Sequence, residues 1–181
     1  MTGRFYRVDG GPANSMAWVK SEYAGELAVL STWLVAVAPW SVSIFREGPL
    51  TAVVFRFLPF RIQYLYGVSI SNELNFVWAW RAMQFPDNTG RAAVLWTLAL
   101  AVVAVAVCAS AYYYHREAEF TDRLPLHPVR FFGGLLGVGG LLVLVATVLL
   151  NLAGGFFGTT IPVGALVAPV LAAVLLTVDL T

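Results

Sequence analysis

The sequence predicts an all-α membrane protein with four transmembrane helices and a long first extracytoplasmic loop that carries a short β-hairpin and an interfacial helix. Of the 181 residues, 59% are hydrophobic and 12% are charged, against about 45–50% and about 25% in soluble domains. The mean hydropathy is +0.77. Together with four long stretches that lack any charged residue, this composition excludes a water-soluble globular fold and intrinsic disorder. Cys108 is the only cysteine, so a disulfide framework within the chain is excluded as well.

Each uncharged stretch has a length suited to a transmembrane helix, since a rise of about 1.5 Å per residue carries roughly 20 residues across the bilayer core. The first stretch contains Pro39 and the fourth contains Pro169, and we expect both to be kinks that neighbouring helices accommodate. Residues 36–38 have the pattern of a signal-peptide cleavage site, but the proline directly after them favours an uncleaved helix. The predicted spans cover about 27–45, 92–114, 131–152 and 161–178, within a single membrane domain over 24–181.

The distribution of arginine predicts the orientation in the membrane. With four spans, the polar tail of residues 1–23 lies on the same side as the connection that holds Arg116, Arg123 and Arg130. Positive charge in short loops marks the cytoplasmic side, so both termini are expected to be cytoplasmic in a multi-pass protein of the plasma membrane. The net charge of +1 gives no reason to expect nucleic acid as a partner. The expected partners are the lipid bilayer and either another membrane protein or further copies of the chain.

The outer loop, residues 46–91, is the least membrane-like part of the chain and therefore the candidate recognition surface. Aromatic and β-branched side chains alternate between residues 52 and 66, which predicts two short strands around Pro59. From residue 71 to residue 85 the apolar side chains recur at helical spacing, which predicts an interfacial helix. The loop combines arginine with aromatic rings, a composition typical of protein interfaces. The candidate recognition residues are Arg56, Arg61, Tyr64, Tyr66, Trp78 and Arg81.

Glycine recurs at the start of the third predicted span. The spacing of Gly133 and Gly137 allows a neighbouring helix to approach closely. We interpret Gly133, Gly137 and Gly140 as helix-packing residues, while contact between copies of the chain and passage of a solute stay open as alternatives. Phosphate binding in a P-loop is excluded because these glycines lie inside an apolar span with no following lysine.

Residues suited to catalysis or to cofactor binding are scarce. The chain has no nucleophile elbow and no His-Glu-x-x-His pair, and the predicted spans carry no ionisable residue at mid-depth, which disfavours proton pumping and ion-coupled transport. His115 and His127 flank three carboxylates in one loop, but their spacing matches no compact metal motif. We therefore predict no catalytic residue, no cofactor and no metal site, and interpret this loop as a solvated connector.

A resemblance to known sequences is carried by residues 18–31, which begin Trp18-Val19-Lys20-Ser21-Glu22-Tyr23-Ala24-Gly25-Glu26, and by residues 39–43, 60–67, 111–114 and 128–136. In these segments the chain resembles a family of uncharacterised haloarchaeal membrane proteins. It implies a multi-pass membrane protein from a host that lives at high salt. Because the family is a domain of unknown function, the resemblance supplies no catalytic residue.

The leading functional hypothesis is a structural, accessory or partner-binding component of the plasma membrane that uses the outer loop as its recognition surface. A small oligomeric transporter or channel is the alternative, with the glycine stripe of the third span facing the path. A membrane-associated enzyme that uses His115 and His127 is the third hypothesis.

Overall fold

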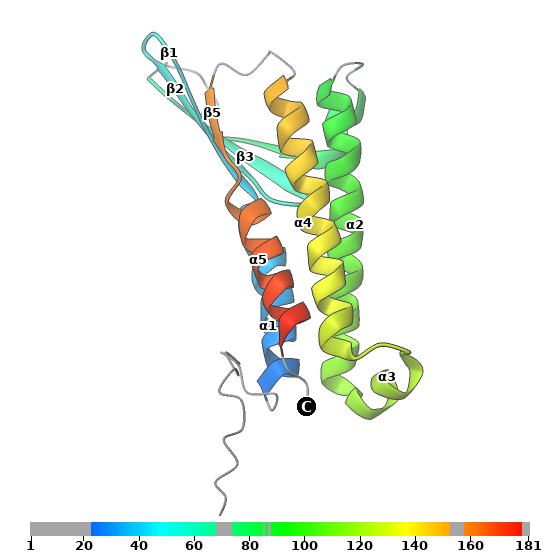
Figure 1. Cartoon of the computed structure of the whole chain (residues 1–181). Helices are drawn as coiled ribbons and strands as arrows, with labels where there is room; N and C mark the ends of the chain where they lie inside the picture. Colours follow the sequence, from blue (N-terminus) through cyan, green and yellow to red (C-terminus); the bar gives the residue numbers. More distant parts are fainter. Residues whose placement is uncertain (1–22, 68–73, 85, 87, 153–157, 179–181) are drawn as a thin grey trace, which may run out of the picture.

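The computed structural model has a mixed α/β fold and describes residues 23–67, 74–84, 86, 88–152 and 158–178 (Figure 1). A bundle of helices packs beside one five-stranded antiparallel sheet, whose strands run in the order β4-β3-β2-β1-β5. The helices are α1 (Ala24–Val37), α2 (Asn88–His115), α3 (Glu117–Arg123), α4 (Pro128–Leu152) and α5 (Val163–Thr177), with the 3-10 helix η2 (Ala79–Gln84). The strands are β1 (Ser41–Glu47), β2 (Leu50–Arg56), β3 (Phe60–Tyr66), β4 (Leu74–Trp78) and β5 (Gly158–Ile161).

The prediction of an all-α protein with four transmembrane helices is wrong. Among the described residues only α2 and α4 are long and apolar enough to cross a membrane, and they contain most of the predicted spans 92–114 and 131–152. Helices α1 and α5 have 14 and 15 residues, which gives about 21–23 Å of helix against a hydrocarbon core of about 30 Å. The predicted span 27–45 runs into β1, and the predicted span 161–178 begins on the last residue of β5.

The chain leaves α1 early because of the segment that follows Val37. Ala38 already has an extended backbone, as expected for a residue before a proline. Trp40 is fully buried, and its indole Nε1 donates a hydrogen bond to the carbonyl oxygen of Val35 at 2.9 Å. The backbone N–H of Trp40 donates to the carbonyl of Arg56 at 2.8 Å. Trp40 therefore fixes the end of α1 and starts the pairing of β1 with β2.

The outer loop contains more strand and less helix than predicted. The two expected strands correspond to β2 and β3, but they lie inside a larger sheet, flanked by β1 and β4. The interfacial helix predicted over 71–85 is wrong, because Leu74–Trp78 forms the edge strand β4 and only Ala79–Gln84 is helical, as a 3-10 turn. Aromatic and β-branched residues favour a sheet, and β4 obtains partners for its backbone from β3 in the register Ile62↔Phe76. Residues 71–73 and 85 lie outside the described residues.

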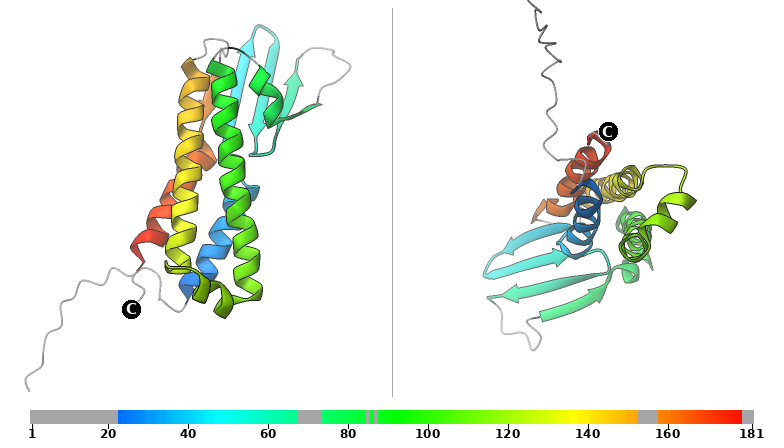
Figure 2. Two further views of the ribbon diagram at one scale, coloured as in Figure 1. Left: turned by 90° about the vertical axis from the view of Figure 1, so that its right-hand side faces the viewer. Right: turned by 90° about the horizontal axis from the view of Figure 1, so that it is seen from below.

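The helices form two layers of unequal length, the long pair α2 and α4 and the short pair α1 and α5, and the two helices of each pair run antiparallel. Helices α2 and α4 run the full height of the molecule, α1 and α5 pack along the half that ends at α3, and the sheet stands beside the other half (Figures 1 and 2). The contacts between the helices use small side chains, which let the backbones approach closely. Fully buried alanines mark these contacts on four helices: Ala28, Ala99, Ala106, Ala146, Ala165 and Ala168. Of the predicted N-terminal tail, residues 1–23, only Tyr23 belongs to the described residues.

Candidate basic cavity between the sheet and the helix hairpin

A cavity of about 280 Å³ lies where the sheet meets α2 and α4. This volume is near the lower end of the roughly 300–1,000 Å³ typical of small-molecule sites. Strands β2 and β3 contribute Arg56 and Arg61, η2 contributes Arg81, and α2 contributes a wall that includes Ala92 and Trp96. Among the lining residues that the structure describes, none is Asp or Glu. The cavity therefore combines a positively charged wall with an apolar one.

The sheet turns its more polar face toward the helices and its apolar face outward. Ser41, Ser43 and Arg56 are buried on the inner face. On the outer face, side chains that neighbour one another across the strands are exposed instead: Ile44, Phe55, Tyr64, Leu74 and Phe76. A sheet that packs on a protein core normally buries its apolar face. The apolar Ala52 and Val54 on β2 are buried on the inner face as well, so this face is mixed, and it presents polar groups to the cavity at Arg56 and Arg61.

Arg56 and Arg61 are direct partners in the β2–β3 ladder, so their side chains leave the sheet on the same face. The Nη1 of Arg56 donates a hydrogen bond to the Oγ of Ser43 on β1, and that oxygen lies 2.7 Å from the Oγ1 of Thr160 on β5. Burial, and secondly the adjacent charge of Arg61, lower the pKa of Arg56 to about 10. Arg56 is thus tied to three strands and still carries its charge near neutral pH.

Arg61 is less well satisfied than its neighbour. Its Nε is buried and has no hydrogen-bond partner among the described residues. Burial lowers the pKa of its guanidinium, because desolvation disfavours the charged form. A buried donor without a partner is costly in a folded protein. The Arg61 side chain is therefore the polar group of the cavity that most needs a ligand.

The wall opposite the arginines is fixed by Trp96. Its indole Nε1 lies 3.2 Å from the carbonyl oxygen of Phe57 and 3.1 Å from that of Leu58, so one N–H on α2 is shared by two carbonyls of the β2–β3 connection. The rings of Phe57 and Phe60 lie with centroids 4.9 Å apart. Both rings line the cavity together with Trp96. This contact holds the sheet at a defined position on the helix hairpin.

The structure separates the predicted recognition residues into two groups. Arg56, Arg61, Trp78 and Arg81 line the cavity, whereas Tyr64 and Tyr66 are exposed away from it. Sequence reasoning missed Trp96 and Ser43 as parts of the site. The sequence could have indicated Trp96, since an indole N–H inside an apolar run needs a hydrogen-bond acceptor. Nothing in the sequence around Ser43 indicated its role, because its partners Arg56 and Thr160 lie on other strands.

The glycines at the start of α4 contact neighbouring helices to different degrees. A Cβ at Gly140 would lie 2.8 Å from the Cδ of Pro169, and one at Gly133 would lie 3.1 Å from the Cβ of Leu175. At Gly137 the nearest atom is the Cβ of Ala172 at 3.5 Å, which is ordinary contact. Gly133 and Gly140 thus lie tightly against α5, which favours packing as their role. The transporter alternative stays a prediction without a structural observation in its favour.

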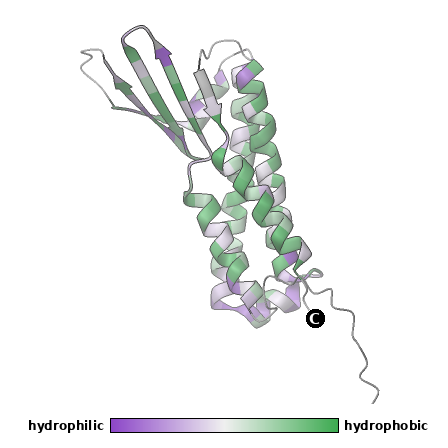
Figure 3. Ribbon diagram, turned by 60° about the vertical axis from the view of Figure 1, so that its left-hand side comes forward, coloured by the Kyte–Doolittle hydropathy of each residue, from purple (hydrophilic) through white to green (hydrophobic). Residues whose placement is uncertain are grey.

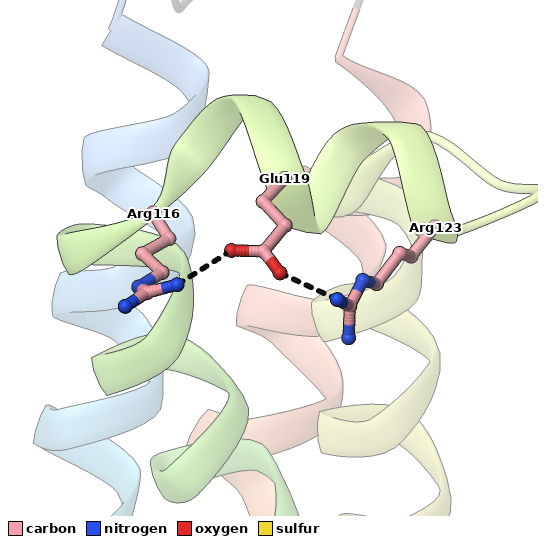
Figure 4. Close-up of polar contacts among 3 residues, drawn as sticks. All are labelled: Arg116, Glu119 and Arg123. Atoms are coloured by element: carbon pink, nitrogen blue, oxygen red, sulfur yellow. Dashed lines mark hydrogen bonds and ion pairs between the residues drawn. The ribbon is translucent and has the colours of Figure 1, made fainter.

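The opposite end of the molecule is polar and carries the two histidines. Glu119 on α3 bridges Arg116, at 3.0 Å, and Arg123 (Figure 4). The hydrogen bond from Arg116 holds the pKa of Glu119 below its usual range. His127 lines a second cavity, of about 580 Å³, between α1 and the α2–α3 corner, and His115 does not. Within the part of the chain that the structure describes, no three His, Cys, Asp or Glu residues are grouped to hold a metal ion.

The cavity offers fixed cations and aromatic side chains, which are groups suited to binding an anion or an apolar group. No curated protein matches the chain. The sequence profile of one family, described as a family of unknown function, matches residues 17–180. The chain therefore belongs to the family of unknown function DUF7549.

Proposed function

We propose that the chain is an integral membrane protein that α2 and α4 anchor in the bilayer, and that it serves as an accessory or partner-binding component through its sheet. The observation that carries this proposal is the exposure of the two helices. Their most apolar segments have mean hydropathies of 2.5 and 2.4, yet only 33% of each is buried inside the chain. A core helix of a soluble protein would be mostly buried, and a signal sequence would lie near the N-terminus.

The surface of the helix pair supports this assignment. Hydrophobic residues follow the helices over most of their length, while hydrophilic ones gather around α3 (Figure 3). Exposed apolar patches of this extent call for lipid or for a partner. The exposed residues include Leu98 and Val105 on α2 and Val138, Leu141, Val145 and Val148 on α4.

The orientation in the proposal follows from charge. The connection between α2 and α4 is short and carries Arg116 and Arg123, and Arg130 lies in the first turn of α4. This clustering of positive charge favours the cytoplasmic side of a plasma membrane. Helix α1 begins and α5 ends at the same end of the molecule (Figure 1), so both termini would be cytoplasmic and the sheet would lie outside. A haloarchaeal host is also part of the proposal and rests on the sequence resemblance alone.

The outer face of the sheet is the proposed partner surface. Exposed rings and aliphatic side chains lie on this face in β1, β2, β3 and β4, and they include Ile44, Phe55, Tyr64 and Phe76. Aromatic residues are enriched in protein interfaces. Either another membrane protein or a second copy of the chain would cover this face.

Labelling of the native thiol tests the membrane assignment. Cys108 is exposed on α2, about two turns before the helix ends at His115. In native membranes we expect a charged, membrane-impermeant maleimide to leave Cys108 unmodified until the protein is unfolded in SDS. Modification at the same rate before and after unfolding would overturn the proposal.

Two single-cysteine variants in a Cys108→Ser background test the orientation. Tyr66→Cys lies at the exposed end of β3 and Asp122→Cys lies on exposed α3. Intact cells are expected to label at residue 66 and to label at residue 122 only after permeabilisation. The reverse pattern would contradict the proposed orientation.

The partner surface is tested by the mass of the particle extracted in mild detergent. The chain alone has a mass of 19.6 kDa, and we expect the native particle to be heavier. Replacing the cross-strand neighbours Tyr64 and Leu74 with threonine should release the single chain without loss of folding, since both side chains are exposed. Leu126→Thr, an exposed residue near α3, is the matched control. A native particle that contains one chain and nothing else would refute the partner surface.

A further inference from the structure

The inner face of the sheet places two guanidinium groups side by side. Arg56 and Arg61 stand opposite each other on β2 and β3, and both line the cavity between the sheet and α2. Like charges directly opposite each other in an antiparallel pair destabilise a sheet. Taking both out of water adds a desolvation cost.

The described residues only partly offset this cost. Arg56 donates to Ser43, but the buried Nε of Arg61 has no hydrogen-bond partner in the part of the chain that the structure describes. Arg81, on η2, adds a third cation to the lining. A negatively charged group in the cavity could accept the hydrogen bond from the Nε of Arg61 and would reduce the repulsion between Arg56 and Arg61.

We propose that this cavity binds a phosphate or carboxylate group, with Arg61 as its main hydrogen-bond donor and Arg56 and Arg81 as supporting cations. Planar guanidinium groups match both oxyanions through paired N–H donors. The proposal goes beyond the partner surface described above, because the cavity lies on the opposite face of the sheet.

The other wall indicates what is attached to the anion. Ala92 and Trp96 on α2 line the cavity across from the sheet, and Phe57 and Phe60 at the β2–β3 connection add two rings to the lining. Such a lining receives an apolar group more readily than a second polar one. A volume of about 280 Å³ accommodates a headgroup and its first carbons and not a whole lipid. Two sources fit this chemistry, namely the headgroup of an anionic lipid and a free organic or inorganic oxyanion.

Thermal unfolding in neutral detergent, followed by tryptophan fluorescence, tests the proposal on the full chain. The probes are inorganic phosphate, decyl phosphate and decanol, with ionic strength held constant by sodium chloride. A second series uses nanodiscs of phosphatidylcholine with and without phosphatidylglycerol. The variants are Arg61→Gln, Arg61→Lys and the control Arg46→Gln, which removes an exposed arginine from β1 of the same sheet.

We expect decyl phosphate to raise the unfolding midpoint of the native chain and decanol to leave it unchanged. Arg61→Gln should weaken the apparent affinity by about tenfold or more, the loss expected for a charge-assisted hydrogen bond. Arg61→Lys should retain part of the effect, and Arg46→Gln should retain all of it. Without any anion, Arg61→Gln should be at least as stable as the native chain, because it removes one of two adjacent cations and the repulsion between them. If Arg61 had only a structural role, Arg61→Gln would instead be less stable than the native chain without any anion.

The two sources give different patterns, and either pattern supports the site. A shift with phosphatidylglycerol or decyl phosphate and none with inorganic phosphate identifies a lipid headgroup, whereas equal shifts with inorganic and decyl phosphate identify a free oxyanion. Equal responses of the native chain and Arg61→Gln to every probe would overturn the proposal. If no anion stabilises the chain but Cys108 is still protected from the maleimide, the anion site is refuted and the membrane assignment stands. The two experiments therefore distinguish failure of one proposal from failure of the other.

Discussion

The contact between α4 and α5 can be tested by adding one methyl group. At Gly140 a new Cβ would lie 2.8 Å from the Cδ and 3.0 Å from the Cγ of Pro169, well inside the 3.4 Å at which ordinary contact begins. The proline ring is part of the α5 backbone and cannot swing aside. Gly140→Ala therefore has to push the two helices apart.

The expected cost follows from the chemistry of overpacking. Extra carbon atoms in a well-packed site typically cost about 1–3 kcal/mol. Glycine to alanine in a helix also brings a gain of up to about 1 kcal/mol in helix propensity, which would mask part of that cost. A second glycine of the same helix removes this ambiguity, because at Gly134 a Cβ meets nothing within 4 Å. The propensity gain is common to both variants and cancels in the comparison.

The assay is thermal unfolding of both variants in mild detergent, monitored by circular dichroism. Gly140→Ala should unfold below Gly134→Ala by roughly 2–12 °C, since about 1 kcal/mol corresponds to about 2–4 °C in a domain of this size. Gly134→Ala should be as stable as the native chain or slightly more so. If Gly140→Ala unfolds at the same temperature as Gly134→Ala or above it, the close approach of α4 and α5 is wrong.

Three other changes test further parts of the structure. Trp96→Phe should lower the free energy of unfolding by about 1–3 kcal/mol, measured by denaturant titration, because it removes the indole donor shared by two carbonyls of the β2–β3 connection. Gly48→Ala should cost about 1 kcal/mol by the same measurement, since this turn residue has φ +56° in open space. Glu119→Gln should lower the unfolding midpoint at pH 7 and have no effect at pH 2. The pKa of Glu119 is lowered in the folded chain, first by its hydrogen bond from Arg116, so its contribution is present above the unfolded pKa and is lost as the pH falls through the folded one.

The long apolar helices were predictable because their signal is local. The uncharged runs 92–114 and 131–152 lie within α2 and α4, and length with hydropathy is sufficient to identify such helices. The alternation between residues 52 and 66 likewise located the strands β2 and β3. In each case the residues that define the element are close together in the sequence.

The remaining strands are determined by their partners in the sheet, which hydropathy along the chain does not show. Residues 41–45 carry no charge and continue the apolar run of α1, so hydropathy alone joins them to the helix. They become strand because β1 pairs along its whole length with β2, from Ser41↔Arg56 to Glu47↔Leu50, and on its other edge with the distant strand β5. A short apolar run is compatible with helix or strand, and only the partner decides between them. The count of four spans failed for this reason.

The sequence also showed that β3 has two different faces without showing which face turns inward. Tyr64 and Ile62 alternate with Gln63 and Arg61, and the rule for soluble proteins would bury the apolar set. The structure turns Arg61 toward the cavity and leaves Tyr64, on the other face, exposed. In the two proposals made above, an apolar partner surface covers the outer face and an anion occupies the inner one, which would offset the cost of an exposed apolar patch and of two adjacent cations. If both proposals hold, alternate residues of one strand serve two different ligands, so Arg61→Gln should impair anion binding without affecting the partner, and Tyr64→Thr should do the reverse.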